Sequence, residues 1–219
     1  LDVEAFVAEM KARGVYLIAR IVVFKDNHMY KAAGGKYAVW DSAEKAPWRG
    51  YFTEKVEAPA PAAPVPSTPP ALLAPSRPAP GASGAPAAPP APAPTYQRKY
   101  MEEYWVDPYS EEIWEYNVAI AREIIARGFD EVQFDYIRFP TDGENLGNAS
   151  YRWQDTGMDK ESALMSFLGY ARRNIEAPIS IDIYGANGWF RSGVRTGQDV
   201  ELLARYVDVI CPMFYPSHF

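Results

Sequence analysis

Three aspartates lie in or directly after apolar segments of the chain, and their carboxyl groups are the ones best placed to do acid–base chemistry. Asp135 lies in EVQFDYIRF, Asp182 lies in ISIDIY, and Asp26 closes the segment VYLIARIVVFKD. A carboxylate inside an apolar strand costs free energy unless it is paired or has a function. For Asp135 and Asp182 both interpretations stay open, with Arg20 and Arg138 as the candidate ion-pair partners of Asp135. Asp26, which precedes Asn-His, also suits a turn.

A second group of polar and aromatic side chains follows the same segments, in loops where they could hydrogen-bond to a substrate or stack on it. The candidates for substrate contact are Asp26, Arg138, Tyr184, Asn187, Trp189, Tyr215 and His218. Asn187 and His218 serve equally well to hold a loop together. Further aromatic candidates are Trp40, Trp48 and Trp105. The two histidines of the chain form no ligand-spaced cluster, so we expect no metal and no other cofactor. A serine hydrolase is disfavoured because G-x-S-x-G is absent.

Four repeats of one unit, an amphipathic helix followed by an apolar strand, must position these side chains. The predicted helices begin near residues 3, 107, 159 and 199, and the strands after them span 15–24, 131–139, 179–184 and 207–215. Asp107 is the predicted N-cap of the second helix, with Pro108 at its first position. Alternation with a period of two places Gln133, Asp135 and Ile137 on one face of their strand and the residues between them on the other.

The repeated units predict an α/β fold with parallel strands, either an open doubly wound sheet or a barrel. No Gly-rich phosphate loop follows a strand, which disfavours a dinucleotide-binding open sheet. Polar and aromatic residues instead gather after the strands, where barrel enzymes keep their chemistry. We therefore expect a (β/α) TIM-barrel type that is incomplete in this chain, since four strands are half a barrel and a whole one takes about 250 residues.

Residues 58–95 consist almost entirely of Ala and Pro with Ser, Gly and a few aliphatic residues. Proline fixes φ and removes a hydrogen-bond donor, so this tract cannot form a packed core and is predicted to be disordered and extended. An interdomain linker and an insertion within one domain both fit. The insertion is favoured because the segment before the tract is too short for a domain of its own. The predicted organisation is thus 1–57 and 96–219 as one barrel domain, interrupted by 58–95.

Composition limits the partners of the protein. The chain of 219 residues has a formal net charge of -6 and no cluster of Lys and Arg, so we expect no nucleic acid partner. No apolar stretch is long enough for a membrane helix. Cys211 is the single cysteine and excludes an intramolecular disulfide. The start, LDVEAFVAEMKARG, reads as a helix without a cap or an initiator Met, so we expect a fragment or a processed product.

Several segments together resemble a bacterial family of glycoside hydrolases with a (β/α)-barrel fold: GVYLIARIVVFKD, WVDPYSEEIWEYNVAIAREIIARGFDEVQFDYIRFPTDG, SIDIYG, Gly197-Gln198 and DVICPMFYPSHF. The resemblance implies further barrel strands before residue 1 and after Phe219. It also implies hydrolysis of a carbohydrate, a polysaccharide or cell-envelope glycan, for which a pair of carboxyl groups is usual. On that basis Asp135 is assigned as nucleophile or base and Asp182 as the acid. The aromatic residues that follow the strands, Tyr184, Trp189 and Tyr215, suit stacking on sugar rings.

Two other functions stay open. A catalytically inert barrel that binds glycan or scaffolds an envelope complex is favoured if Asp135 and Asp182 are both buried and salt-bridged, whereas an open pair without a neutralising Arg favours the enzyme. An ordinary α/β enzyme with an open sheet is the third interpretation. A carboxyl separation of about 5 Å would indicate retention of configuration and about 6.5 to 9.5 Å inversion. A glycan substrate favours the cell envelope or another extracytoplasmic location, and the single cysteine also fits the cytoplasm.

Overall fold

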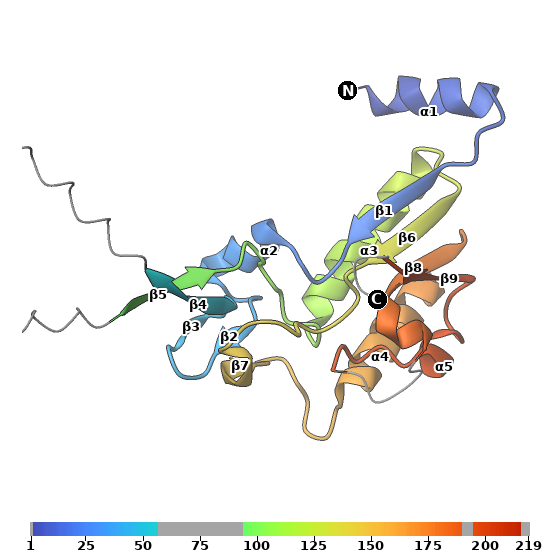
Figure 1. Ribbon diagram of the computed structural model, residues 1–219. Helices are drawn as coiled ribbons and strands as arrows, with labels where there is room; N and C mark the ends of the chain where they lie inside the picture. Colours follow the sequence, from blue (N-terminus) through green and yellow to red (C-terminus); the bar gives the residue numbers. More distant parts are fainter. Residues whose placement is uncertain (1, 57–93, 190–194, 216–219) are drawn as a thin grey trace, which may run out of the picture. The chain divides into compact units, whose positions relative to one another are not determined.

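The computed structural model describes residues 2–56, 94–189 and 195–215 (Figure 1). The chain divides into two compact units, one formed by residues 1–52 and 100–219 and the other by residues 53–99. The Ala/Pro tract 58–95 lies outside the described residues except for Pro94 and Thr95. Its interpretation as a disordered insertion that interrupts one domain therefore stays a prediction.

The helices and strands alternate along most of the chain. The α-helices are α1 (Val3–Ala12), α2 (Asn27–Lys31), α3 (Glu111–Ala126), α4 (Lys160–Asn174) and α5 (Val200–Leu203), with 3-10 turns at η1 (Ala32–Gly34), η2 (Leu146–Asn148) and η3 (Gly185–Gly188). The strands are β1 (Ile18–Val22), β2 (Trp40–Asp41), β3 (Ala46–Pro47), β4 (Tyr51–Val56), β5 (Thr95–Tyr100), β6 (Glu131–Asp135), β7 (Ala149–Ser150), β8 (Ile179–Tyr184) and β9 (Val209–Met213).

Strands β1, β6, β8 and β9 form a parallel sheet in that order, so the chain adds each new strand on the same side of the last. Right-handed crossovers then place the connecting helices on one face of the sheet, where α3, α4 and α5 lie (Figure 1). A doubly wound sheet would reverse its strand order and carry helices on both faces. The fold is therefore α/β of the (β/α)-barrel type, as predicted, and the sheet is not closed within the described residues.

The hydrophobic core lies between this sheet and its helices. In β1, β6 and β8, alternate residues are buried against the helices, as Ile21, Phe134 and Ile181 show. Phe134 meets Phe167 of α4 edge to face, with ring centroids 5.3 Å apart. Burial of each such side chain contributes about 1.5 to 3 kcal/mol. The opposite face of the strands is left for polar residues, which include Asp135 and Asp182.

The predicted start of the second helix at Asp107 is wrong. Helix α3 begins at Glu111, three residues later than predicted, with Ser110 rather than Asp107 as its N-cap. The carboxylate of Asp107 instead accepts hydrogen bonds from the backbone N–H groups of Tyr109 and Trp153, at 3.0 and 3.1 Å. Asp107 thus joins two loops that are distant in the sequence, and the turn that contains Pro108 precedes the helix.

The strand predicted over 131–139 is also shorter than expected. β6 ends at Asp135, because Tyr136 takes a left-handed backbone conformation with φ of 52°. The alternation of faces therefore stops at Asp135, and neither Ile137 nor Arg138 has the strand position that the period of two predicted. By contrast, Asp159 and Asp199 cap α4 and α5 where those helices were expected to start.

The remaining described strands form two small sheets. Strand β2 pairs antiparallel with β3 and with β7, in the larger unit. Strands β4 and β5 pair with one another. Within the smaller unit, Lys99 of β5 forms an ion pair with Glu54 of β4 at 2.8 Å.

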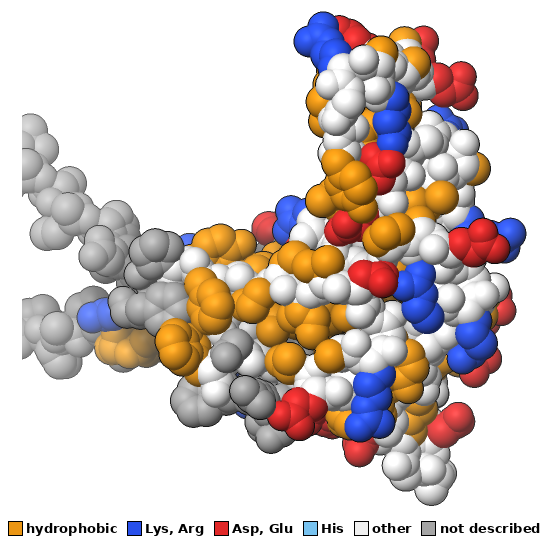
Figure 2. Space-filling view, turned by 90° about the vertical axis from the view of Figure 1, so that its right-hand side faces the viewer, with side chains coloured by type: hydrophobic (Ala, Val, Ile, Leu, Met, Phe, Trp, Pro, Cys, Tyr) orange, Lys and Arg blue, Asp and Glu red, His pale blue; other side chains and the backbone are white. Residues whose placement is uncertain are grey.

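Charged side chains of both signs are interspersed on the face shown in Figure 2, and Lys and Arg do not gather there into one patch. Among the helices that the structure describes, none has both the length and the apolar composition needed to cross a membrane.

Candidate active site

Asp135 and Asp182 lie side by side on neighbouring strands, near the ends where the chain leaves the sheet. Phe134 of β6 is in register with Ile181 of β8, and the next positions along the two strands are Asp135 and Asp182. Since side chains alternate along a strand, both carboxyl groups are on the face opposite the helices. Asp135 and Asp182 therefore lie on one face of one sheet, and their catalytic roles stay predictions.

Arg20 of β1 contacts both acids from the same face. Its Nη2 forms an ion pair with Oδ2 of Asp135, and its Nε lies 3.5 Å from Oδ2 of Asp182. Asp135 is fully buried and Asp182 is 8% exposed, whereas the Arg20 side chain is 55% exposed. One guanidinium group therefore joins the two carboxyl groups and remains open to solvent. Arg20, which the sequence offered as a partner of Asp135 by its strand position, is a partner of both.

The other oxygen of each carboxyl group also has a hydrogen-bond donor. The backbone N–H of Tyr136 donates to Oδ1 of Asp135 at 2.7 Å. The Gln133 amide donates to Oδ1 of Asp182 at 3.0 Å. These bonds hold both carboxyl groups in one orientation, as a reacting pair requires. Gln133 of β6 thus binds Asp182 of the neighbouring strand β8. The residues around Gln133 in the sequence do not reveal this contact.

The charges of the site favour a proton on Asp182. Burial is the main cause that raises the pKa of Asp182, the negative charge of Asp135 raises it further, and Arg20 acts in the opposite direction. Burial lowers the pKa of Arg20, but its contacts with Asp135 and then Asp182 raise it overall. One cation faces two acids, so a proton on Asp182 leaves the trio of side chains neutral.

Gln198 ties the ends of β6 and β8 together behind the acids. Its side-chain amide donates to the carbonyl oxygens of Ile137 and Asp182, at 3.3 and 3.2 Å, and its Oε1 accepts from the backbone N–H of Tyr184 at 2.9 Å. Gln198 is buried. The only sequence signal for it was its place in the Gly197-Gln198 step of the resemblance, and the candidate list missed it.

Asn187 supports the same loop. It is fully buried, and its amide nitrogen donates to the carbonyl oxygen of Gln198 and to Thr196 Oγ1. These bonds hold the loop, as one interpretation of the sequence expected, and the substrate contact of Asn187 stays a prediction.

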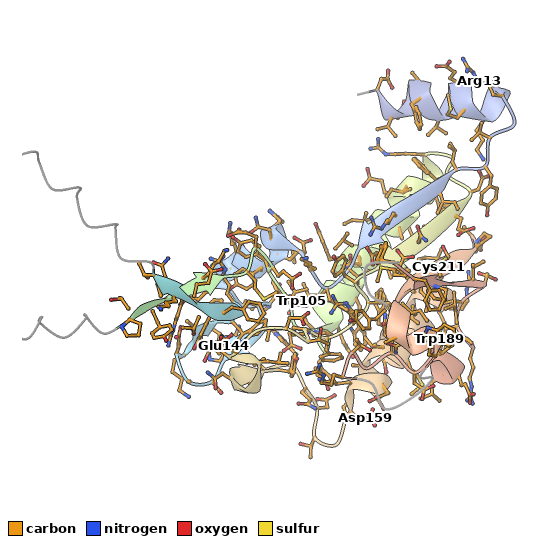
Figure 3. All side chains as sticks on the ribbon, in the orientation of Figure 1. Arg13, Trp105, Glu144, Asp159, Trp189 and Cys211 are labelled. Carbon is orange, nitrogen blue, oxygen red and sulfur yellow. The ribbon has the colours of Figure 1, made fainter. Side chains whose placement is uncertain are left out.

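Arg138 lies at the edge of the site, three residues after Asp135. Its guanidinium group stacks over Trp105, which is labelled in Figure 3, and over Tyr136, at 4.9 and 5.3 Å from the ring centroids. Its Nη1 donates to Phe139 O at 3.3 Å and Thr141 Oγ1 at 3.4 Å. The sequence offered Arg138 as one of two candidate ion-pair partners of Asp135. The structure shows that it is not a partner of Asp135.

The other predicted contact residues have different surroundings. Asp26 caps α2, where its Oδ1 accepts from the backbone N–H groups of His28 and Met29 at 2.7 and 3.0 Å, so the turn interpretation describes its structural role. Tyr184 ends β8 on the face of the two acids and is 40% exposed. Trp189, labelled in Figure 3, is 70% exposed, and its ring contacts that of Phe214 at 5.9 Å.

Two candidates lie near or beyond the end of the described chain. Tyr215 is about half exposed and lies close enough to Arg20 to contribute to the raised pKa of Arg20. His218 lies outside the described residues. Of the additional tryptophans, Trp48 and Trp105 are buried. Within residues 2–56, 94–189 and 195–215, no three His, Cys, Asp or Glu side chains are grouped so that they could hold a metal ion.

Comparison with known proteins relates the whole chain to one family. Residues 1–219 match the model of the family described as "Putative glycosyl hydrolase domain". No curated protein matches the chain.

Solved structures give weaker similarities. A hypothetical protein from Ruminiclostridium thermocellum is 24% identical with a TM-score of 0.53, over 83% of this chain and 65% of that one, so the chain spans less than two thirds of its length. An alpha-galactosidase from Thermus thermophilus in complex with stachyose is 14% identical with a TM-score of 0.48, over 96% of this chain and 31% of that enzyme. A mutant trehalulose synthase is 12% identical with a TM-score of 0.41, over 82% of this chain and 31% of that enzyme.

Proposed function

The chain belongs to this family of glycosyl hydrolase domains, and from that premise we propose that Asp135 and Asp182 are the pair of carboxyl groups with which it cleaves a polysaccharide or cell-envelope glycan. The observation that carries the proposal is the shared guanidinium of Arg20, which contacts both acids at the ends of adjacent strands. Glycosidases usually act with two such groups, one acid and one nucleophile or base.

The two acids differ in surroundings, and this supports different roles. Asp182 is the proposed acid, because burial and the charge of Asp135 raise its pKa and so favour the protonated form that a leaving oxygen needs. Asp135 is the proposed nucleophile or base, because it forms the closer ion pair with Arg20. Arg20 is then a positioning residue that holds both carboxyl groups.

Aromatic side chains near the acids support a sugar substrate. Tyr184 lies on the same face as Asp182 and is 40% exposed, and Trp189 follows in the next loop with 70% of its surface exposed. The C–H groups of a pyranose ring stack on such exposed rings, whereas buried rings are not available. Both residues are therefore proposed to contact the substrate.

The proposal is tested with Asp135→Asn and Asp182→Asn in the complete gene product, assayed on a panel of polysaccharides and cell-envelope glycans. Each substitution keeps the size and hydrogen-bonding oxygen of the side chain but removes the acid function. We expect turnover to fall by at least about 100-fold in each variant. Asp159→Asn, which changes an exposed helix cap, is the matched control and should keep its activity. Wild-type turnover by a folded Asp135→Asn variant would remove Asp135 from the mechanism.

A second candidate function is an inert barrel that binds glycan, and one observation favours it: both acids are buried and both contact Arg20. The hydrolase remains the main proposal because the chain belongs to a family of glycosyl hydrolase domains. The two functions differ in a simple measurement. An inert barrel would bind a glycan without releasing reducing ends, both as the wild type and as the Asp135→Asn variant.

We also propose that the protein acts in the cell envelope or outside the cytoplasm, because its proposed substrate is located there. Fractionation of cells that express the complete gene product, followed by detection of the protein, tests this location. Recovery only in the cytoplasmic fraction would contradict it.

A further inference from the structure

Arg138 is a buried cation without a carboxylate partner in the described part of the chain. It is 9% exposed, its buried Nε–H donates to no acceptor among the described residues, and Nη1 donates only to Phe139 O and Thr141 Oγ1. The nearby acid Asp142 accepts a hydrogen bond from Thr141 at 3.0 Å rather than from the guanidinium group. Burial of an unpaired guanidinium is costly, so its presence calls for an anion.

The aromatic neighbours of Arg138 do not supply that anion. Trp105 and Tyr136 lie under the guanidinium group at 4.9 and 5.3 Å. A desolvated cation–π contact is worth about 2 kcal/mol, which is less than the several kcal/mol that desolvation of an ion costs. Stacking therefore orients the guanidinium group but leaves its charge uncompensated.

Lys25 and Glu103 lie beside the same rings but do not supply the missing anion. The Nζ of Lys25 lies 4.6 Å from the ring centroid of Tyr136. Glu103 accepts hydrogen bonds from Lys25 at 2.7 Å and from the indole N–H of Trp105 at 3.1 Å. Its carboxylate is therefore paired with Lys25 and not with Arg138.

The backbone places this positive group directly beside the proposed catalytic pair. Tyr136 donates its N–H to Asp135 at 2.7 Å while its ring lies beneath Arg138. Its φ of 52° is unusual for a tyrosine and costs about 1 to 3 kcal/mol, which tends to persist where function requires the geometry. Gln198 binds the carbonyl oxygens of Ile137 and Asp182 and so fixes this turn to the neighbouring strand.

We propose that Arg138 binds the carboxylate of an acidic sugar, so that the glycan cleaved at Asp135 and Asp182 contains uronic acid residues. The inference rests on the proposed hydrolase function and adds the charge of the substrate to it. A planar guanidinium group matches a carboxylate with two parallel hydrogen bonds, and Arg138 has donors that no described residue uses.

The test compares oligouronides with their methyl esters, which have the same sugar and linkage but no charge, and with sulfated glycans and neutral glycans. For the wild-type protein we expect a KM at least about 10-fold lower on the oligouronide than on its ester. Arg138→Gln should remove this preference by raising KM on the oligouronide, with little change on the ester. Arg138→Lys keeps the charge without the planar fork and should keep part of the preference.

Arg152→Gln is the matched control, because Arg152 also stacks on a tryptophan, Trp40, at 4.1 Å but lies outside the proposed site. It should leave the ratio of the two KM values unchanged. Thermal melts of all variants separate loss of binding from loss of folding, and Arg138→Lys keeps the test valid if Arg138→Gln does not fold.

The outcomes separate this inference from the hydrolase proposal. Equal KM values on ester and oligouronide, unaffected by Arg138→Gln, would overturn the acidic-sugar inference while leaving the hydrolase intact. A preference for sulfated over carboxylated glycans would also overturn it. If no glycan is cleaved but calorimetry shows oligouronide binding that Arg138→Gln weakens by about 10-fold or more, the anion subsite stands and the hydrolase proposal fails.

Discussion

The free energy of unfolding of the wild-type protein should fall as the pH rises, and Asp107→Asn should abolish the part of this fall that comes from Asp107. Asp107 is completely buried, and its carboxyl group accepts backbone hydrogen bonds from Tyr109 and Trp153. Burial raises the pKa of Asp107 from its ordinary value of 3.8 to about 6, and the backbone hydrogen bonds only partly oppose this effect. Asparagine has the same shape but only one accepting oxygen, so it loses one of the two backbone hydrogen bonds, a cost that does not change with pH. It also has no proton to lose.

The sign and size of the effect follow from this pKa. Between pH 4 and 6 the folded protein holds a proton on Asp107 that the unfolded chain has lost, so folding takes up a proton and stability falls as the pH rises. The contribution is fully present below pH 3.8 and is lost as the pH passes 6. The difference between the two pKa values corresponds to about 3 kcal/mol. That is a large part of the roughly 5 to 15 kcal/mol that stabilises a typical domain.

Urea unfolding of both proteins from pH 4 to pH 8 measures this directly. The free energy of unfolding of Asp107→Asn minus that of the wild type should increase by about 2 kcal/mol between pH 4 and pH 7, which covers most of the full effect. The subtraction cancels every other group that titrates in this range. Asp159→Asn is the control, because hydrogen bonds from Ser162 lower the pKa of Asp159 below 3.8 and its difference from the wild type should therefore stay nearly constant between pH 4 and pH 8. A difference for Asp107→Asn that stays constant with pH would refute the assigned ionisation.

Two further substitutions test the site and its support. Arg20→Met should lower stability at pH 7 by about 1 to 3 kcal/mol, less than for a fully buried pair because Arg20 is more than half exposed. It should also raise the pKa of Asp182, moving the alkaline limb of the pH–rate profile upward; an unmoved limb would contradict the acid role. Gly185→Ala would push a Cβ into the carbonyl oxygen of Met213 and should cost about 1 to 3 kcal/mol in urea unfolding, whereas unchanged stability would show that β8 and β9 separate easily there.

Local sequence patterns were sufficient for the class of the fold and for the face of the two acids. Apolar periodicity marks the helices and strands, because a helix or strand buries one side regardless of its partner. Alternation along EVQFD and ISIDI places Asp135 and Asp182 away from the helices, since successive side chains of a strand point to opposite faces. The same local rule holds for Asp159, which caps α4 where the sequence predicted.

Tertiary structure alone decided which groups these residues meet. Asp107 resembles a helix cap in the sequence, yet it binds the backbone of Trp153, which lies 46 residues away. The left-handed turn at Tyr136 places Arg138 over Trp105, and no pattern of apolar residues signals such a turn. The pairing of Arg20 with both acids depends on the register of three strands. Sequence periodicity determines the side of a strand on which a charge lies, whereas the charge it faces depends on strands brought together only by folding.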